Sequence, residues 1–291
     1  MSVDSTGAGV RLPGVLRVLA GALLLGWMAG CGSSGEAPRI SPEPIAASKE
    51  GLYAKGQQYW QEQRVDSAEV LFARAASMDS AYLPPVRDLA QLQYELAHRE
   101  PEKSKPRLDR LRAARAQYAR LEKRGVTESE LYDRLCELSM LLNDDRAFLT
   151  YAKKNAELYP FDRQQYNLAR AYFDAGDFQG VIKSAKTSVE KFADSPYISS
   201  FYRILGRAYM KVDRDQTAER TLTAGVKATD ARIAGLRKGD AAGYKSTDQY
   251  RRLQDDKVQM LLMLKQLHTT YKAQDKLQEV DRQLKLEGYD R

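Results

Sequence analysis

The chain has 291 residues, of which 43% are hydrophobic and 29% charged, with a formal net charge of +7. This composition is typical of a folded soluble protein and excludes a mainly disordered chain. The two cysteines, Cys31 and Cys136, are too few for a disulfide scaffold. The two histidines, His98 and His268, are far apart in sequence, which removes most zinc sites and most Ser-His or Cys-His catalytic arrangements.

The first residues have the pattern of an export signal. An apolar run extends from Val15 to Met28, with Arg11 before it and Arg17 near its start. This run is shorter than the roughly 20 residues that a membrane span needs. The run ends in small residues followed by Cys31. We therefore expect a signal peptide over residues 1–30.

The sequence Met28-Ala29-Gly30-Cys31 resembles the lipobox of bacterial lipoproteins, in which cleavage precedes a cysteine that becomes lipidated. The resemblance implies a lipid on Cys31 and a membrane association through that anchor. Because Gly32 rather than Asp follows the cysteine, it also implies the outer membrane, with the protein facing the periplasm. The alternative is an ordinary secretory signal with a chance cysteine.

Residues 31–48 are predicted to be a flexible linker after the lipid. They have no hydrophobic period and contain three prolines. A coil of this size has a root-mean-square span of roughly 20–25 Å, enough to hold a folded part clear of a bilayer.

After residue 48, apolar residues recur at steps of three and four, which predicts helices rather than strands. The helices are expected to form hairpins with short polar turns, such as those at 64–66 and 175–177. When the sequence is compared with itself at a shift of 34 residues, small and aromatic residues recur at equivalent positions. One frame contains Gly56, Tyr59, Ala68, Phe72 and Ala75; another contains Tyr202, Leu205, Gly206, Tyr209, Ala218, Leu222 and Gly225.

This spacing resembles the tetratricopeptide repeat (TPR), with frames beginning near residues 49, 83, 128, 162, 199 and 258. The predicted fold class is all-α, a TPR-like helical-hairpin solenoid of about five to six repeats over 49–235. Residues 236–291 are predicted to form a loop and a C-terminal helical cap. We expect a loop at Gly235–Lys245, a long helix at Ser246–Thr270 and a shorter one near Gln274–Glu287.

The side chains of each first helix are expected to line a partner-binding groove. Aromatic residues and arginines are common there, as in interface hot spots, which suggests an extended or helical peptide with acidic groups. The alternative is that some aromatic residues pack between repeats. The candidates are Tyr53, Gln57, Trp60, Arg87, Gln91, Tyr94, Tyr132, Tyr166, Arg170, Phe173, Arg203, Arg207 and Met210.

A second candidate surface is basic. Residues 103–124 contain nine Lys and Arg against Asp109 and Glu122. An apolar stripe in this segment predicts a helix that packs inward and presents charge outward, toward anionic lipid or an acidic partner; a solvated helix face is the alternative. The outward residues are predicted to be Arg112, Arg120, Lys123 and Arg124.

No catalytic, cofactor-binding or metal site is predicted, because the usual phosphate, zinc and nucleophile motifs are missing from the sequence. Cys136 and His268 are expected to be packed residues, and His98 an exposed one. The pairs Asp144-Asp145 and Asp255-Asp256 are expected in turns or on exposed faces.

Together these expectations describe a protein that is not an enzyme and has no cofactor, small-molecule substrate or nucleic-acid partner. It would be a lipid-anchored outer-membrane scaffold that binds protein partners in a cell-envelope machine. By resemblance, such proteins include pilotins of type IV pilus secretins, outer-membrane assembly lipoproteins and gliding-motility lipoproteins. The alternative is an architectural spacer between the outer membrane and the cell wall or inner-membrane partners, without a peptide groove.

Overall fold

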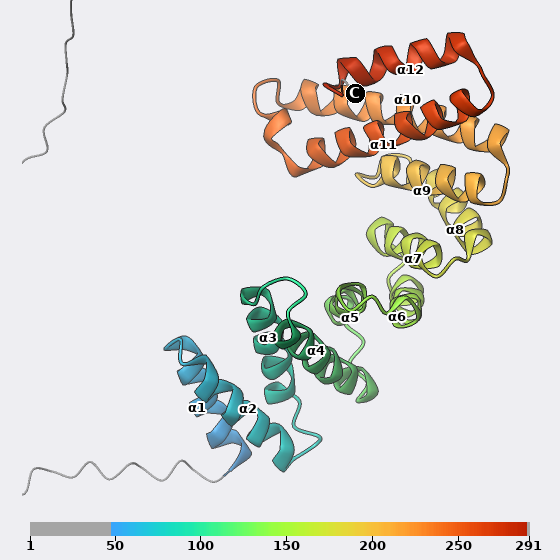
Figure 1. Cartoon of the computed structure of the whole chain (residues 1–291). Helices are drawn as coiled ribbons and strands as arrows, with labels where there is room; N and C mark the ends of the chain where they lie inside the picture. The colour runs from blue at the N-terminus through green and yellow to red at the C-terminus, as the bar shows by residue number, and fades with distance from the viewer. Residues whose placement is uncertain (1–47, 290–291) are drawn as a thin grey trace, which may run out of the picture. The chain divides into compact units, whose positions relative to one another are not determined.

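A computed structural model describes residues 48–289 (Figure 1). The predicted signal peptide, Cys31 and nearly all of the predicted linker lie outside the described residues. Within 48–289 no helix is both long enough and apolar enough to cross a membrane.

The described residues form helices joined by short connections (Figure 1). Most are 13 or 14 residues long, but α3, α4, α10 and α11 are longer. The helices are α1 (Lys49–Gln61), α2 (Val65–Met78), α3 (Pro84–Arg99), α4 (Lys105–Lys123), α5 (Ser129–Leu141), α6 (Asp145–Leu158), α7 (Asp162–Asp174), α8 (Phe178–Lys191), α9 (Ile198–Lys211), α10 (Asp215–Gly239), α11 (Asp248–Thr270) and α12 (Gln274–Leu286), with a 3-10 turn at Tyr244–Ser246.

Each helix packs against the next one along the chain, and α9 also packs against α7 and α11. Because nearly all packing is between near neighbours, the apolar side chains form successive clusters rather than one central core. The predicted all-α helical-hairpin solenoid is therefore confirmed.

One turn geometry recurs between the two helices of a hairpin. Its middle residue has a positive φ, and the backbone N–H of the following residue donates to the carbonyl five positions earlier, which closes the first helix. A single left-handed residue thus reverses the chain within three residues. The middle residues are Gln63, Asn143, Gly176, Asp213 and Lys272, and the donors are Arg64, Asp144, Asp177, Arg214 and Ala273.

Small residues allow the two helices of a hairpin to approach closely, as the repeat pattern predicts. A Cβ atom added to Gly56 would lie 2.7 Å from the ring of Phe72, and one added to Gly206 would lie 2.3 Å from Leu222. Both contacts are well below van der Waals distance, so a larger residue at either crossing would force the facing side chain to move.

The C-terminal part differs from the prediction in two places. Helix α10 continues through Gly235 to Gly239, so the expected loop at Gly235–Lys245 begins only at Asp240, and the predicted boundary at 235/236 lies inside a helix. An exposed glycine costs a helix only about 1 kcal/mol, which is too little to end it. The repeat frame expected near residue 258 is wrong, because that position lies inside α11, whereas the helices expected at Ser246–Thr270 and near Gln274–Glu287 are confirmed within two residues.

Candidate protein-interaction groove

An open groove of about 780 Å³ crosses three first helices of successive hairpins, α3, α5 and α7. Helix α4 and the start of α9 complete its lining. Of the predicted partner-binding residues, Arg87, Gln91 and Tyr166 line it directly. The other lining residues are Asp88, Tyr118, Leu121, Glu130, Leu131, Asp133, Arg134, Cys136, Glu137, Met140, Arg163, Asn167 and Tyr197.

Buried apolar side chains form the base of the groove. Leu121, Leu131 and Cys136 are each less than 5% exposed. Burial raises the pKa of the Cys136 thiol to about 12, so the thiol stays protonated at neutral pH. Cys136 is therefore a packed apolar residue, as expected, and a poor nucleophile.

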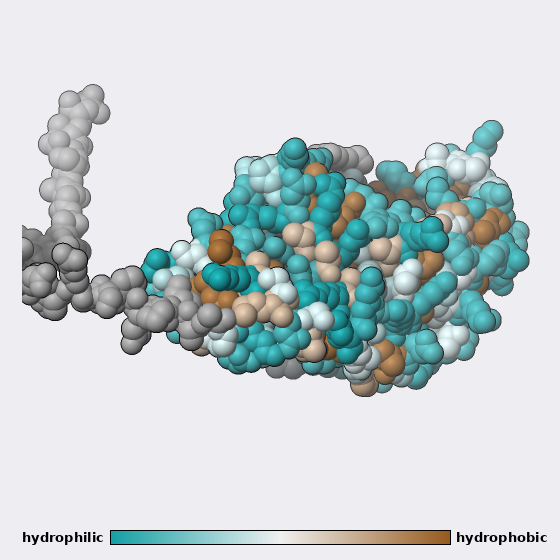
Figure 2. All heavy atoms as spheres, turned by 90° about the horizontal axis from the view of Figure 1, so that it is seen from below, coloured by the Kyte–Doolittle hydropathy of each residue, from teal (hydrophilic) through white to brown (hydrophobic). Residues whose placement is uncertain are grey.

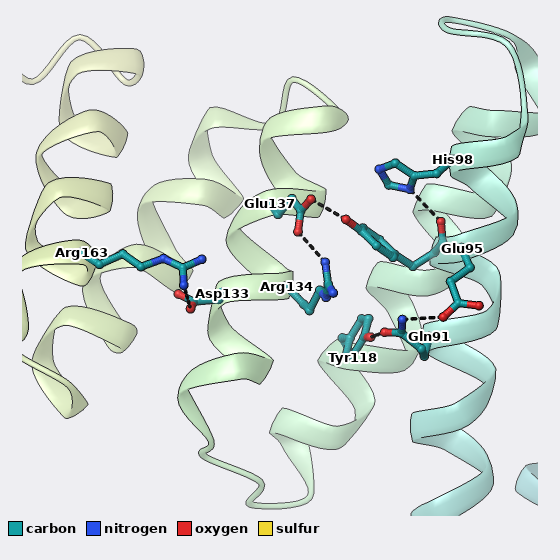
Figure 3. Close-up of polar contacts among 9 residues, drawn as sticks. Gln91, Glu95, His98, Tyr118, Asp133, Arg134, Glu137 and Arg163 are labelled. Atoms are coloured by element: carbon teal, nitrogen blue, oxygen red, sulfur yellow. Dashed lines mark hydrogen bonds and ion pairs between the residues drawn. The ribbon is translucent and has the colours of Figure 1, made fainter. Parts of the chain in front are cut away.

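Polar side chains join α3 to α5 across the groove (Figure 3). The hydroxyl of Tyr94 donates to Glu137, and Arg134 donates to the same carboxylate at 2.8 Å while its guanidinium lies 4.2 Å from the centre of the Tyr94 ring. Burial and the hydrogen bond to Glu137 raise the pKa of Tyr94 to about 12. These contacts hold Tyr94 in one orientation beside the groove.

Further contacts fix the neighbouring polar groups. The hydroxyl of Tyr118 donates to the amide oxygen of Gln91 at 3.0 Å, and the Gln91 amide donates to Glu95 at 2.8 Å (Figure 3). Arg163 on α7 lies 3.5 Å from Asp133 on α5. The groove is thus preorganised, because its side chains are already held in place by bonds within the chain.

At the α7–α9 end, the groove is bounded by two stacked aromatic rings. Tyr166 and Tyr197 have ring centroids 5.5 Å apart at an interplanar angle of 24°. The guanidinium of Arg203 donates to the Tyr166 hydroxyl at 3.1 Å and to Asp256 on α11 at 2.6 Å. A continuous polar chain therefore connects the groove to α11.

Most of the groove lining was not among the residues predicted from sequence, and neither was Asp256, at the far end of this polar chain. Asp256 is only 5% exposed, and the hydroxyls of Ser199 and Ser200 also donate to it, at 2.7 and 2.5 Å. The expectation that both members of the Asp255-Asp256 pair are exposed is wrong for Asp256. The helical spacing from Leu253 and Met260, three and four residues away, could have placed it on the buried face.

The predicted residues of α1 do not line this groove. The hydroxyl of Tyr53 donates to Asp88 on α3 at 2.9 Å, and Gln57 donates to that hydroxyl at 2.7 Å. Trp60 packs edge-on against Phe72, with ring centroids 5.8 Å apart. Here the alternative interpretation holds, because these side chains fill the junctions among α1, α2 and α3.

Tyr132 is also misplaced by the predicted register. It is 3% exposed and packs in the apolar cluster shared by α3, α4 and α5. The charged groups that act on its hydroxyl, Glu122 and Lys154, belong to α4 and α6. Tyr132 therefore faces the neighbouring second helices rather than the groove.

The remaining predicted residues lie on α7 and α9. The Arg207 guanidinium lies 4.3 Å from the centre of the Phe173 ring, and Arg170 is 3.6 Å from Asp174. Met210 is half-buried against the apolar cluster of α9. These residues form a surface beside the groove, and Arg170 and Asp174 border a smaller pocket of about 330 Å³.

Only some side chains of the predicted basic surface on α4 are free of polar contacts with other residues of 48–289. Arg112 and Lys123 are exposed, and Arg112 pairs with Asp109 at 3.0 Å. Arg120 donates to the Ala76 carbonyl at 2.9 Å, and Arg124 donates to Ser80. The prediction that these residues project away from the packing face is therefore wrong for Arg120, which binds the preceding hairpin, while Arg124 is exposed although it donates to Ser80.

The face of the described residues that Figure 2 shows is mainly hydrophilic. In the face shown in Figure 2, hydrophobic residues appear as small separate groups. His98 is exposed and His268 is 6% exposed, both as expected. Within 48–289, no group of three or more His, Cys, Asp or Glu side chains could hold a metal ion.

No protein-family model matches the chain, and none of the curated proteins compared with it matches in sequence. Among solved structures, the C-terminal part of a TPR repeat-containing protein from Cytophaga hutchinsonii is 14% identical, with a TM-score of 0.56, over 84% of this chain and 86% of that one.

Two other solved structures are less similar. YrrB, described as a TPR protein with an unusual peptide-binding site, is 11% identical over 66% of this chain and 92% of its own, with a TM-score of 0.49. PilF of Pseudomonas aeruginosa is 14% identical over 81% and 90%, with a TM-score of 0.44. The match to the Cytophaga structure, together with the hairpin geometry, shows that this chain has the TPR fold.

Proposed function

We propose that the chain is a lipid-anchored scaffold that binds a protein segment in the groove across α3, α5 and α7. The single observation that supports this most is the groove itself, about 780 Å³ in volume, with an apolar base and polar walls. A cleft of this size, with an apolar base and a few fixed polar groups, is typical of ligand-binding sites in general. It is built on packed helices, so binding costs little ordering of the protein.

The proposed setting is the periplasmic face of the outer membrane, where the scaffold takes part in assembling or holding a cell-envelope machine such as a pilus secretin, a barrel-assembly complex or a gliding-motility complex. Support comes from the apolar run and Cys31 in the sequence. The proposed role requires no catalysis. Incorporation of a palmitate analogue into the wild-type chain, but not into Cys31→Ser, is the expected result of a labelling experiment; a soluble, unlabelled wild-type chain would contradict the anchor.

Site-specific photo-crosslinking in the native cell tests the groove. A photoreactive amino acid at Asn167 or Met140, both on the groove lining, is expected to give the same discrete crosslinked product. The matched control is Thr187, an exposed residue on α8. If α8 gives the product while the two groove positions give none, the partner binds elsewhere. No crosslink from any position favours the architectural spacer.

A further inference from the structure

The arginines of the groove already have carboxylate partners within the chain. Arg134 pairs with Glu137 at 2.8 Å and Arg163 with Asp133 at 3.5 Å. Arg87 makes two hydrogen bonds, at 2.6 and 2.9 Å, to Glu128 just outside the lining. Each of the three arginines that line the groove is therefore matched by one carboxylate.

The carboxylates of the groove are in excess over these pairs. Asp88 accepts hydrogen bonds only from neutral groups, the Tyr53 hydroxyl at 2.9 Å and the Gln57 amide at 3.4 Å. The carboxylate of Glu130, exposed in the first turn of α5, makes no hydrogen bond or ion pair with another side chain of 48–289. The lining thus carries four carboxylates against three arginines, and neither Asp88 nor Glu130 forms an ion pair in the described part of the chain, although the charge of Arg87 lies near enough to attract Asp88.

The negative charge of the groove lining is opposite in sign to the net charge of the described residues. Residues 48–289 contain 42 Lys and Arg against 35 Asp and Glu, so the surroundings are basic. A negative groove on a positive protein does not follow from composition. Complementary charge both attracts a partner and excludes partners of the wrong sign.

We propose that the occupant of the groove is a peptide segment that carries Lys or Arg side chains, with cations placed against Asp88 and Glu130. This inference rests on the proposed function and deepens it by naming the partner chemistry. It replaces the acidic segment expected from sequence, because Arg87 and Arg203 are already paired with Glu128 and Asp256.

The apolar part of the groove favours a peptide over a small free cation. Met140 lies on the lining and is only half-buried, so it offers apolar surface that a hydrophobic side chain can cover, whereas Leu121 and Leu131 are already buried by the protein. A nucleic acid is disfavoured because its phosphates would lie against the unpaired carboxylates.

The test uses the purified full chain in mild detergent and three fluorescent peptides of one length and one apolar pattern. Their variable positions are all Lys, all Gln or all Glu, and binding is followed by fluorescence anisotropy. The Lys peptide is expected to bind most tightly and the Glu peptide most weakly. Added salt should weaken the binding of the Lys peptide, because salt screens the attraction between partly exposed charges.

Two groove variants locate the effect. Asp88→Asn and Glu130→Gln should each lower the affinity for the Lys peptide by about two- to fivefold, which is the range expected for loss of an exposed ion pair. The affinity for the Gln peptide should not change. Asp255→Asn, which removes an exposed charge on α11, is the matched control and should change nothing. Glu130 is on the surface, so its variant is expected to fold even if Asp88→Asn does not.

The outcomes separate the inference from the function it rests on. Tightest binding by the Glu peptide, or a Lys-peptide affinity that both groove variants leave unchanged, would overturn a basic partner while the crosslinks from Asn167 could still support a scaffold. Displacement of the Lys peptide by spermidine, with no binding of the Gln peptide, would identify a small cation as the ligand and also overturn the inference. Absence of crosslinks at the groove would instead refute the proposed function.

Discussion

Replacing Asp256 by Ala should destabilise the α9–α11 junction more than almost any other single polar change. The carboxylate is 5% exposed and accepts three hydrogen bonds, from Ser199, Ser200 and Arg203. The variant would leave the guanidinium of Arg203, which keeps only its bond to Tyr166, without its counter-charge.

The magnitude follows from what is left unpaired. Hydrogen bonds to a charged group contribute about 1.5–3 kcal/mol each, but three bonds to one carboxylate are not additive, since water can enter the space that alanine leaves. Breaking a buried ion pair by removing one partner typically costs about 3–5 kcal/mol, and we expect a loss in that range. Asp256→Asn keeps an acceptor oxygen and should lose less.

Hydrogen exchange is the most direct assay, because repeat proteins can open one repeat at a time and a single unfolding transition is not assured. Amides of α9 and α11 should lose protection in Asp256→Ala, while those of α1 and α2 should not. The neighbouring Asp255→Ala changes an exposed residue of the same helix and should leave protection unaltered. Equal protection in the two variants would show that the buried network contributes little.

Three further changes test the packing. Gly206→Ala should destabilise by about 1–3 kcal/mol in chemical denaturation, because its Cβ would meet Leu222 at 2.3 Å. Gly235→Ala, in the exposed helix interior where nothing lies within 4 Å, should instead stabilise by about 0.5–1 kcal/mol; a loss there would mean that α10 does not extend past 235. In a Cys31→Ser background, Cys136 should resist a thiol reagent at pH 8 until denaturant is added, because it is 1% exposed and its pKa is raised to about 12; rapid native labelling would contradict its burial.

The regular part of the fold could be predicted from sequence because it depends on local spacing. Glycine and aromatic positions in the Gly56 and Gly206 frames correspond to real helix crossings at Phe72 and Leu222. The predicted frames near 83, 128 and 199 begin within one residue of α3, α5 and α9. The frame expected near 258 falls inside α11, and the end of α10 was placed too early, because both helices exceed the repeat length and periodicity within a long helix does not mark its end.

The candidate site was predicted less completely, because side-chain pairing is not local. Arg87 and Arg203 were expected to be free to bind a carboxylate, but Glu128 and Asp256 come from other helices, 41 and 53 positions along the chain. Adjacent hairpins place such distant residues side by side, and no spacing rule within one repeat identifies the partner. The sequence identifies the arginines that lie on first helices. Only the packing shows which of these arginines are already paired with a carboxylate.

The position of the groove depends on the α3–α4 hairpin, which is longer than the other hairpins early in the chain. The α3–α4 hairpin has a longer connection at residues 100–104 and the 19-residue helix α4, instead of the three-residue turn used by the other hairpins. Tyr118 and Leu121 in the later turns of α4 line the groove, although α4 is a second helix. A register that assigns binding residues to first helices alone therefore omits part of the site, and insertions that lengthen a second helix deserve inspection wherever a groove is sought in a repeat of this kind.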